Sequence, residues 1–484
     1  MPKQEVFHLH PLGWENDPEE EKFPMSTLDY LTACSYNNYA LFFQLEDDQK
    51  TGAVEVLKAG LERTLSQARH LCGTIEKDPA GGHYFSKKKD STVRLFVQWL
   101  DEGDYPSFDD IAKSHFSAVT LGDLNTWSVP PMTYGEKPEA ALDVSPVVSA
   151  FKANFIRGGL VFNMHHHHYA NDVMGWAGFT HQLAENCNAI FNNKTTFPTW
   201  DLACLDRSRL TRAEPPEEVK IDGPPPPERH PGHAGSVSLL FHLPKSKAAE
   251  LKKLAFPTDG SSWISTYDAF SAFIWRNLTR LRAPIFNPDM SSNLFWIEAV
   301  DMRRRFHSPK VPARIQGNIL SAAMASDAPI PQPTVADLIS EWPLTKLALF
   351  IREVTNGGTQ ENLDKTLEVV ATIRNKPALN IRIDSQPPLS ILMTDHREAN
   401  VTAANFGFAS PVTYRHLFDR CTQGVIVVYP PRTAAPDSDE GVEFSITYEK
   451  NLVQTLIDDP EWNKYFEYRG VDAVDAVDAV DASQ

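Results

Sequence analysis

The stretch "GGLVFNMHHHHYANDVMGWAGF", Gly158 to Phe179, contains the pattern that decides the fold. Its apolar run at 160–164 has the length and composition of a buried β-strand. After Asp172 the apolar residues recur every three or four positions, which predicts an amphipathic helix whose N-terminus Asp172 caps. A strand, a turn rich in histidine and a helix are therefore expected in succession, well inside the chain.

The four consecutive histidines, His165 to His168, have three possible roles. They are polar residues at a strand end that hydrogen bonds satisfy, or metal ligands, or a run in which one residue is a general base. Zinc needs three or four converging ligands, and adjacent residues on a strand do not all converge, so the pattern disfavours a metal. Imidazole titrates near neutral pH and accepts a proton from an alcohol or amine, which keeps the third role open.

His168 is the natural candidate for a base, because it ends the run and lies four residues before Asp172. The spacing alone does not distinguish an Asp172 that orients the ring of His168 from one that braces the loop. An HxxxD pattern by itself also occurs by chance in many chains. The residues therefore favour a base at His168 without excluding the structural alternative.

Composition narrows the class of protein. The chain has 484 residues and a formal charge of −17, from 46 basic and 63 acidic side chains. This charge disfavours nucleic acid and anionic lipid as partners, and no apolar run is long enough for a membrane span. The N-terminus resembles neither a signal nor a transit peptide, so we expect a cytoplasmic protein. The five scattered cysteines predict free thiols rather than a disulfide framework.

The chain divides at a proline-rich linker. Residues 212–235 contain "EPPEE" and "GPPPPERHPG", which force an extended, exposed path. We expect an N-terminal domain at 1–211, a crossover at 212–235 and a C-terminal domain at 236–469. The final 470–484, with its repeated Val-Asp-Ala, predicts a disordered acidic tail. The mixture of helical and strand patterns in both halves predicts an α/β protein.

His167-His168-x-x-x-Asp172, after Gly158-Gly159 and a short apolar strand, resembles the HHxxxD signature of BAHD-type CoA-dependent acyltransferases. The resemblance is greatest to the fungal branch that includes trichothecene 3-O-acetyltransferases. Further stretches agree in order and spacing with the motifs of this family; they are "STLDYL" (26–31), "STYDAFSAFIWRNLTRLR" (265–282), "VDMRRRFHSPKVPARIQGN" (300–318) and "NFGFASPVTYR" (405–415). The resemblance thus covers nearly the whole chain.

The resemblance implies a specific fold and mechanism. The fold would be two chloramphenicol-acetyltransferase-like α/β domains joined by a crossover, with a solvent channel at their interface. His168 would be the general base, and His167, the first histidine of the motif, would contribute to substrate binding. Asp172 would be structural and would pair with Arg303 rather than relay charge to His168.

A CoA site would require local positive charge in this acidic chain. Lys245 and Lys252 lie on a predicted helix that Ser246 would cap, and a helix N-terminus with nearby lysines can hold an anion. The alternative is a solvated face of an amphipathic helix. Thr394 matches a residue of the CoA channel in the family.

The family motif DFGWG is altered here. It reads Asn405-Phe406-Gly407-Phe408-Ala409, so a neutral amide replaces a carboxylate and Ala409 replaces a glycine. Alanine in that position would be strained if the backbone needs a positive φ. Since the motif lies outside the chemistry, we expect an effect on loop stability rather than on catalysis.

Taken together, these features predict an acyl-CoA-dependent O-acyltransferase, acting on a hydroxyl of a fungal secondary metabolite. We expect acyl-CoA, in the simplest case acetyl-CoA, as co-substrate, with no tightly bound cofactor, no metal and a monomeric chain. Neither a GxSxG elbow nor a distinctive cysteine is present, which favours a ternary complex over an acyl-enzyme. Alternatives are N-acylation, a cyclisation or proton transfer on the same fold, and a non-catalytic binding protein.

Overall fold

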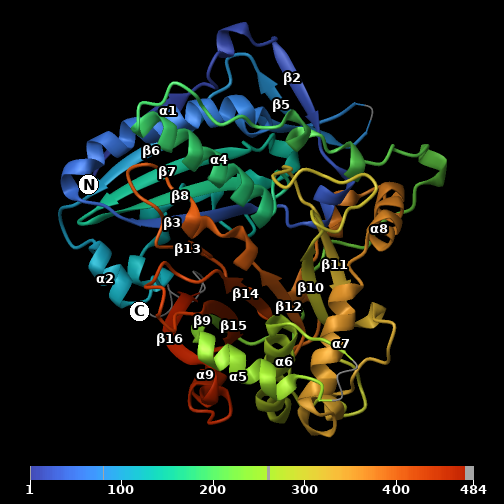
Figure 1. Ribbon diagram of the computed structural model, residues 1–484. Coiled ribbons are helices and arrows are strands. Elements are labelled where there is room, and N and C mark those ends of the chain that lie inside the picture. Colours follow the sequence, from blue (N-terminus) through green and yellow to red (C-terminus); the bar gives the residue numbers. More distant parts are fainter. Residues whose placement is uncertain (1, 80, 259–261, 475–484) are drawn as a thin grey trace.

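The computed structural model describes residues 2–79, 81–258 and 262–474. Two large β-sheets, each covered by helices, lie one above the other in Figure 1. Each sheet packs against its own cluster of buried apolar side chains. The predicted α/β class is confirmed.

The first sheet has the strand order β1-β6-β7-β8-β3-β13. In chain order its strands are β1 (Lys3–Leu9), β3 (Tyr36–Gln44), β6 (Val93–Leu100), β7 (Ser149–Ile156), β8 (Gly159–His167) and β13 (Thr413–His416). Helices α1 (Lys50–Gln67) and α4 (Val173–Phe191) pack together over one face of it (Figure 1). A small sheet of β2 (Glu20–Pro24), β4 (Thr74–Lys77) and β5 (His83–Lys88) adjoins this half, as do the short helices α2 (Phe108–Lys113) and α3 (Leu124–Trp127).

The second sheet has the order β11-β10-β12-β14-β15-β9-β16. Its strands are β9 (Ser236–Leu243), β10 (Trp296–Asp301), β11 (Leu320–Met324), β12 (Ile391–Asp395), β14 (Val425–Tyr429), β15 (Val442–Glu449) and β16 (Glu467–Val474). The helices of this half are α5 (Lys245–Ala255), α6 (Thr266–Phe286), α7 (Leu344–Asn356), α8 (Gln360–Thr372) and α9 (Val453–Ile457). Residues 212–235 connect the halves along a mostly irregular path, as predicted.

Strand β8 and helix α4 form the predicted strand–turn–helix unit. All nine residues of β8 are buried, because both faces of the strand are covered. Phe162 and Met164 belong to the apolar core beneath α4, whereas Asn163 lies in a polar layer with Asn154 and Asn38. Asp172 caps α4 by accepting a hydrogen bond from the Gly175 N–H at 2.7 Å, as the sequence predicted.

Strand β13 comes from the second half of the chain but completes the first sheet. Its residues Thr413 to His416 pair antiparallel with β3. The predicted boundary at 212–235 therefore separates the two halves in sequence, while one strand of 236–469 joins the sheet of 1–211. Sequence patterns report strand formation but not the partner strand, which is why this exchange was not predicted.

The expectation of disorder from residue 470 onward is wrong for 470–474. These residues belong to β16, which pairs with β9, and Asp472 is buried with an Oδ1 that accepts from the Ala118 N–H at 3.4 Å. The Val-Asp-Ala composition is acidic, yet alternation places Asp472 inward beside the Arg415 charge. The rest of the predicted tail, 475–484, lies outside the described residues.

Candidate active site

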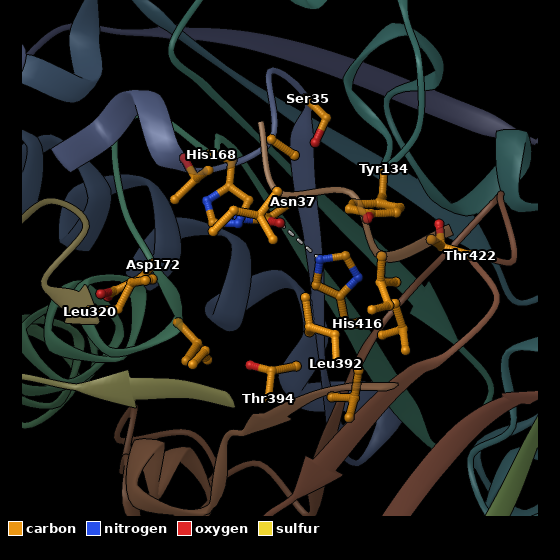
Figure 2. Close-up of a pocket in the computed structure, with 18 of the residues that line it drawn as sticks. Ser35, Asn37, Tyr134, His168, Asp172, Leu320, Leu392, Thr394, His416 and Thr422 are labelled. Atoms are coloured by element: carbon orange, nitrogen blue, oxygen red, sulfur yellow. Dashed lines mark hydrogen bonds between the residues drawn. The ribbon is translucent and has the colours of Figure 1, made fainter. Parts of the chain in front are cut away.

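A cavity of about 260 Å³ lies between the two sheets. One side is formed by β3, the end of β8 and β13, and the other by β10, β11, β12 and β14. His168, Asp172 and Thr394, three residues singled out from the sequence, all line it (Figure 2). The solvent channel inferred from the family resemblance stays a prediction, placed at this same interface.

His168 follows the last residue of β8 and is half-buried at the cavity wall. Its N–H donates to the Ser35 carbonyl at 2.8 Å, and its carbonyl accepts from Asn318 Nδ2 at 2.9 Å. Burial lowers the pKa of His168 below the usual 6.5, against the opposing effects of its own carbonyl and the Asp172 charge. The ring is therefore neutral near pH 7 and able to accept a proton.

Asp172 uses both carboxylate oxygens in structural contacts. Oδ1 accepts from Arg303 Nη2 at 2.8 Å and from the Gly175 N–H, and Oδ2 accepts from Arg303 Nη1 at 3.0 Å and from the Ile319 N–H at 2.8 Å. Burial alone would raise the pKa of Asp172, but the Arg303 charge and these donors lower it. The pairing of Asp172 with Arg303 that the resemblance implied is present.

A second buried network holds the backbone of His168. Asp29 Oδ1 accepts from Asn318 Nδ2 at 2.9 Å, and the same amide group donates to the His168 carbonyl. Arg207 bridges Asp29 and the Ala170 carbonyl at 3.3 and 3.0 Å. Asp29 and Asn318 stood in recognised motifs, but nothing in the sequence assigned Arg207 to this loop, because its contacts are all distant in the chain.

The remaining histidines of the run lie outside the cavity wall. His165 donates from Nδ1 to the Met132 carbonyl at 2.8 Å and accepts from the Val129 N–H at 3.2 Å. His167 donates from Nε2 to the Ala140 carbonyl at 3.0 Å and accepts from the Tyr169 N–H at 3.2 Å. Both match the interpretation of polar residues that hydrogen bonds satisfy. His167, which the resemblance placed at the substrate, is fully buried behind the wall.

His166 lies on the opposite face of β8. Its ring meets Phe151 and Phe179 edge-on, with centroids 5.9 and 5.4 Å away. Neither ring nitrogen has a hydrogen-bond partner among the described residues. His166 therefore fills the apolar core as a neutral aromatic ring.

The predicted anion site on α5 is already occupied by the protein. Pro244, not Ser246, is the N-cap residue, and Ser246 donates to Asp439 from its N–H at 2.8 Å and its hydroxyl at 2.6 Å. Lys245 Nζ donates to the Ser438 carbonyl, and Lys252 lies over the Trp263 ring at 5.0 Å. The prediction that Ser246 caps the helix is wrong, since a carboxylate brought by a distant loop takes the helix N-terminus. Lys245, Ser246 and Lys252 do not line the cavity.

Two further histidines, His396 and His416, line the cavity and were not identified from the sequence. Thr394 and His396 are joined by a hydrogen bond of 3.1 Å between Oγ1 and Nε2, and His396 Nδ1 lies 2.6 Å from the Tyr414 hydroxyl. Burial lowers the pKa of His396 to about 4. Isolated histidines 396 and 416 show no motif, so only the folding of β12 and β13 against the cavity reveals them.

The altered DFGWG motif forms a tight loop against α4. Gly407 has φ +89°, and a Cβ there would lie 2.5 Å from Cβ of Phe191. Asn405 is exposed and its Oδ1 accepts from the Gly407 N–H at 2.8 Å, a bond that needs no charge. Ala409 is not among the residues with positive φ, so the anticipated strain at this position does not arise.

No three histidine, cysteine, aspartate or glutamate side chains of the described residues are grouped as a metal site requires. Within the same residues, none of the helices has the length and apolarity needed to cross a bilayer.

The chain matches a family model described as "Transferase family" over residues 15–462. Acetyltransferase FGR3 of Gibberella zeae is 72% identical over 476 residues, which cover 98% of this chain and 95% of that protein. Trichothecene 3-O-acetyltransferase TRI101 of Fusarium sporotrichioides is 25% identical over 459 residues, 90% of this chain and 94% of that protein.

Solved structures support the same relationship at the level of the fold. The crystal structure of F. graminearum TRI101 with ethyl coenzyme A has a TM-score of 0.74 and 20% identity, covering 93% of this chain and 100% of that one. Vinorine synthase has a TM-score of 0.64 and 17% identity, covering 94% and 96%. With the family model spanning most of its length, the chain belongs to the Transferase family of BAHD-type acyltransferases and has their two-domain fold.

Proposed function

We propose that the protein transfers an acetyl group from acetyl-CoA to a hydroxyl group of a fungal secondary metabolite, with His168 as the general base. The observation that carries this proposal is a neutral imidazole at the wall of an enclosed cavity between the two sheets, with its backbone held on both sides. The 72% identity to a protein named as an acetyltransferase supports the choice of acetyl as the acyl group.

The reaction needs one proton acceptor and no covalent enzyme intermediate. His168 takes the proton of the acceptor hydroxyl as its oxygen attacks the thioester carbonyl carbon. The tetrahedral intermediate then collapses, the carbon–sulfur bond breaks, and His168 returns the proton to the departing CoA thiolate. The products are an ester and CoA thiol, so His168 ends in its starting state.

The role proposed for Asp172 is to hold the turn that follows His168. Four donors, from Arg303, Gly175 and Ile319, occupy its carboxylate, which accepts about four hydrogen bonds in all. No acceptor site is left for the His168 ring. Arg303 and Asp172 therefore support the position of the base and take no part in proton transfer.

Thr394 is proposed as part of the wall along the thioester, as in the family resemblance. It lies across the cavity from His168 in Figure 2, on β12 of the second sheet. Asn405 and Gly407 are proposed as structural residues of the loop before β13. A monomeric, cytoplasmic protein is proposed as well; sedimentation velocity would test the monomer, and a fluorescent fusion expressed in a fungal host would test the location.

The experiment that tests the function is release of CoA thiol from acetyl-CoA against a panel of hydroxylated fungal metabolites. Wild type, His168→Ala and the control His166→Phe are compared, since His166 belongs to the same run but lies in the core. We expect turnover with wild type and the control and a loss of about 10²–10⁴-fold in His168→Ala. Turnover that survives in His168→Ala, or the absence of turnover and of CoA binding by calorimetry in wild type, would contradict the proposal.

A further inference from the structure

A second polar group lines the cavity, formed by His416 at the end of β13 and Asn37 at the start of β3. His416 is 4% exposed and Asn37 is 3% exposed. The proposed mechanism uses neither residue. Figure 2 shows His168 and His416 on different sides of the cavity, with the Asn37 side chain joined to the His416 ring by a hydrogen bond.

The hydrogen bond between the two residues determines which His416 nitrogen carries the proton. His416 Nε2 lies 3.0 Å from Asn37 Oδ1, an oxygen that only accepts, so Nε2 is the donor. Burial, with His396 and His168 nearby, lowers the pKa of His416 well below its usual value, so the ring is neutral. In a neutral ring with its proton on Nε2, Nδ1 is a hydrogen-bond acceptor.

Two polar atoms of the pair have no partner in the part of the chain that the structure describes. They are His416 Nδ1, an acceptor, and Asn37 Nδ2, a donor. A buried polar atom left unsatisfied costs about 1–3 kcal/mol, so a native protein normally provides a partner for it. Because both residues line the cavity, a ligand held there is the source of those partners.

The His416 ring is fixed in orientation before any ligand binds. Phe418 stacks on it with a centroid distance of 4.0 Å, and Tyr39 and Tyr134 meet it edge-on at 4.8 and 5.4 Å. Such packing on several sides removes the entropy cost of orienting the imidazole when a ligand arrives. The arrangement is that of a preorganised recognition group rather than a mobile surface histidine.

We propose that His416 and Asn37 recognise a second oxygen function of the acceptor, namely a hydroxyl that donates to His416 Nδ1, with Asn37 Nδ2 donating to an oxygen of the same molecule. The inference rests on the proposed function and narrows its substrate class. Much of the remaining wall is aliphatic, including Ile297, Leu320 and Leu392. The acceptor is therefore an apolar alcohol with at least two oxygen substituents, one at His168 and another at His416.

This arrangement has a consequence for regioselectivity. A rigid diol with one hydroxyl against His416 presents its other hydroxyl to His168, so the pair decides which hydroxyl is acylated. A site built to hydrogen-bond a hydroxyl strongly rejects an analogue that lacks it, because its own buried groups are then left unpaired. His416 is thus a specificity residue and not a second base.

The test separates recognition from transfer by measuring binding alone. A decalin diol with hydroxyls on opposite rings and the matched decalin mono-ol are titrated by calorimetry into the full-length His168→Ala protein saturated with CoA. We expect the diol to bind about tenfold more tightly than the mono-ol, as one ligand hydrogen bond of about 1.4 kcal/mol requires. In the double variant with His416→Phe the two ligands should bind equally, and in that with His416→Gln, whose amide oxygen accepts, part of the preference should return.

Nitrogen-15 NMR of labelled histidine supplies a readout that a merely structural role would not change. The His416 signals should show the Nε2–H tautomer in the free protein, and Nδ1 should shift on addition of diol but not of mono-ol. Equal binding of diol and mono-ol, failure of the diol to bind, or a preference that survives His416→Phe would overturn the inference. Loss of acetyl transfer with the diol preference intact would instead overturn the proposed function alone.

Discussion

Arg303 donates to both carboxylate oxygens of Asp172, with Nη2 2.8 Å from Oδ1 and Nη1 3.0 Å from Oδ2. The pair is buried and links the turn after β8 to the chain segment before β11. Its effect on His168 is one of position, since the turn that Asp172 holds is the one that follows the base. This relationship separates a structural Asp172 from a charge relay and makes the two roles experimentally distinct.

Replacing Asp172 with asparagine should lower stability much more than it changes the chemistry of the base. Breaking one side of a buried ion pair leaves the Arg303 charge uncompensated, at a cost of about 3–5 kcal/mol in the free energy of unfolding. Urea denaturation of Asp172→Asn measures this loss. The pH at which kcat/KM falls by half should remain that of wild type; a change in that midpoint without a loss of stability would favour a relay.

Activity should depend on pH through a single group that must be unprotonated. Burial lowers the pKa of His168 below 6.5, so the base is neutral at pH 7 and becomes protonated only as the pH falls further. We expect kcat/KM to be level near neutrality and to decrease with a midpoint below 6.5. Steady-state rates between pH 5 and 8 measure it, with His168→Ala as the control that lacks this limb. A midpoint above 6.5 would contradict a base kept neutral by burial.

The histidine run should make the protein sensitive to acid. Burial lowers the pKa of His165 and His166 to about 3 and that of His167 to about 4. Between these values and about 6.5 the unfolded chain binds more protons than the folded one, so their contribution is present above pH 6.5 and is lost as the pH falls. Each histidine should reduce the free energy of unfolding by about 1.4 kcal/mol per pH unit below 6.5.

The variant His166→Phe isolates one member of that set. Its ring sits between Phe151 and Phe179, and no described residue bonds either nitrogen, so phenylalanine should fit without loss of stability at pH 7. Urea midpoints at pH 5, 6 and 7 should then show a shallower dependence on pH, by about one proton, than in wild type. An unchanged slope would show that His166 does not remain neutral in the folded protein.

The loop of the altered DFGWG motif should tolerate a charge but not a side chain at its glycine. Gly407→Ala forces a Cβ to 2.5 Å from Cβ of Phe191 at a φ of +89°, and should destabilise the protein by about 1–3 kcal/mol. Asn405→Asp keeps the acceptor for the Gly407 N–H in an exposed position, so its effect should stay within about 0.5 kcal/mol. Thermal unfolding of both variants decides between a loop defined by glycine and one defined by charge.

Local pattern was sufficient for the elements that carry the base. The run at 160–164 and the apolar period after Asp172 predicted β8, α4 and the cap between them, because strand alternation, helical periodicity and capping are properties of neighbouring residues. The resemblance added the Asp172–Arg303 pair. The sequence also suggested that Ser246 caps α5, where the position is instead served by Asp439, nearly two hundred residues away.

By itself, then, the sequence determined the order of strands and helices, the base at the end of β8 as a candidate, and the family. Tertiary structure alone decided which histidine of the run meets the cavity, that β13 completes the first sheet, and that His416 and Asn37 stand beside the base. The physical reason is that hydrogen bonding within a turn is encoded over a few residues. Burial, pKa and the convergence of side chains depend instead on contacts between segments far apart in the chain, which no local pattern records.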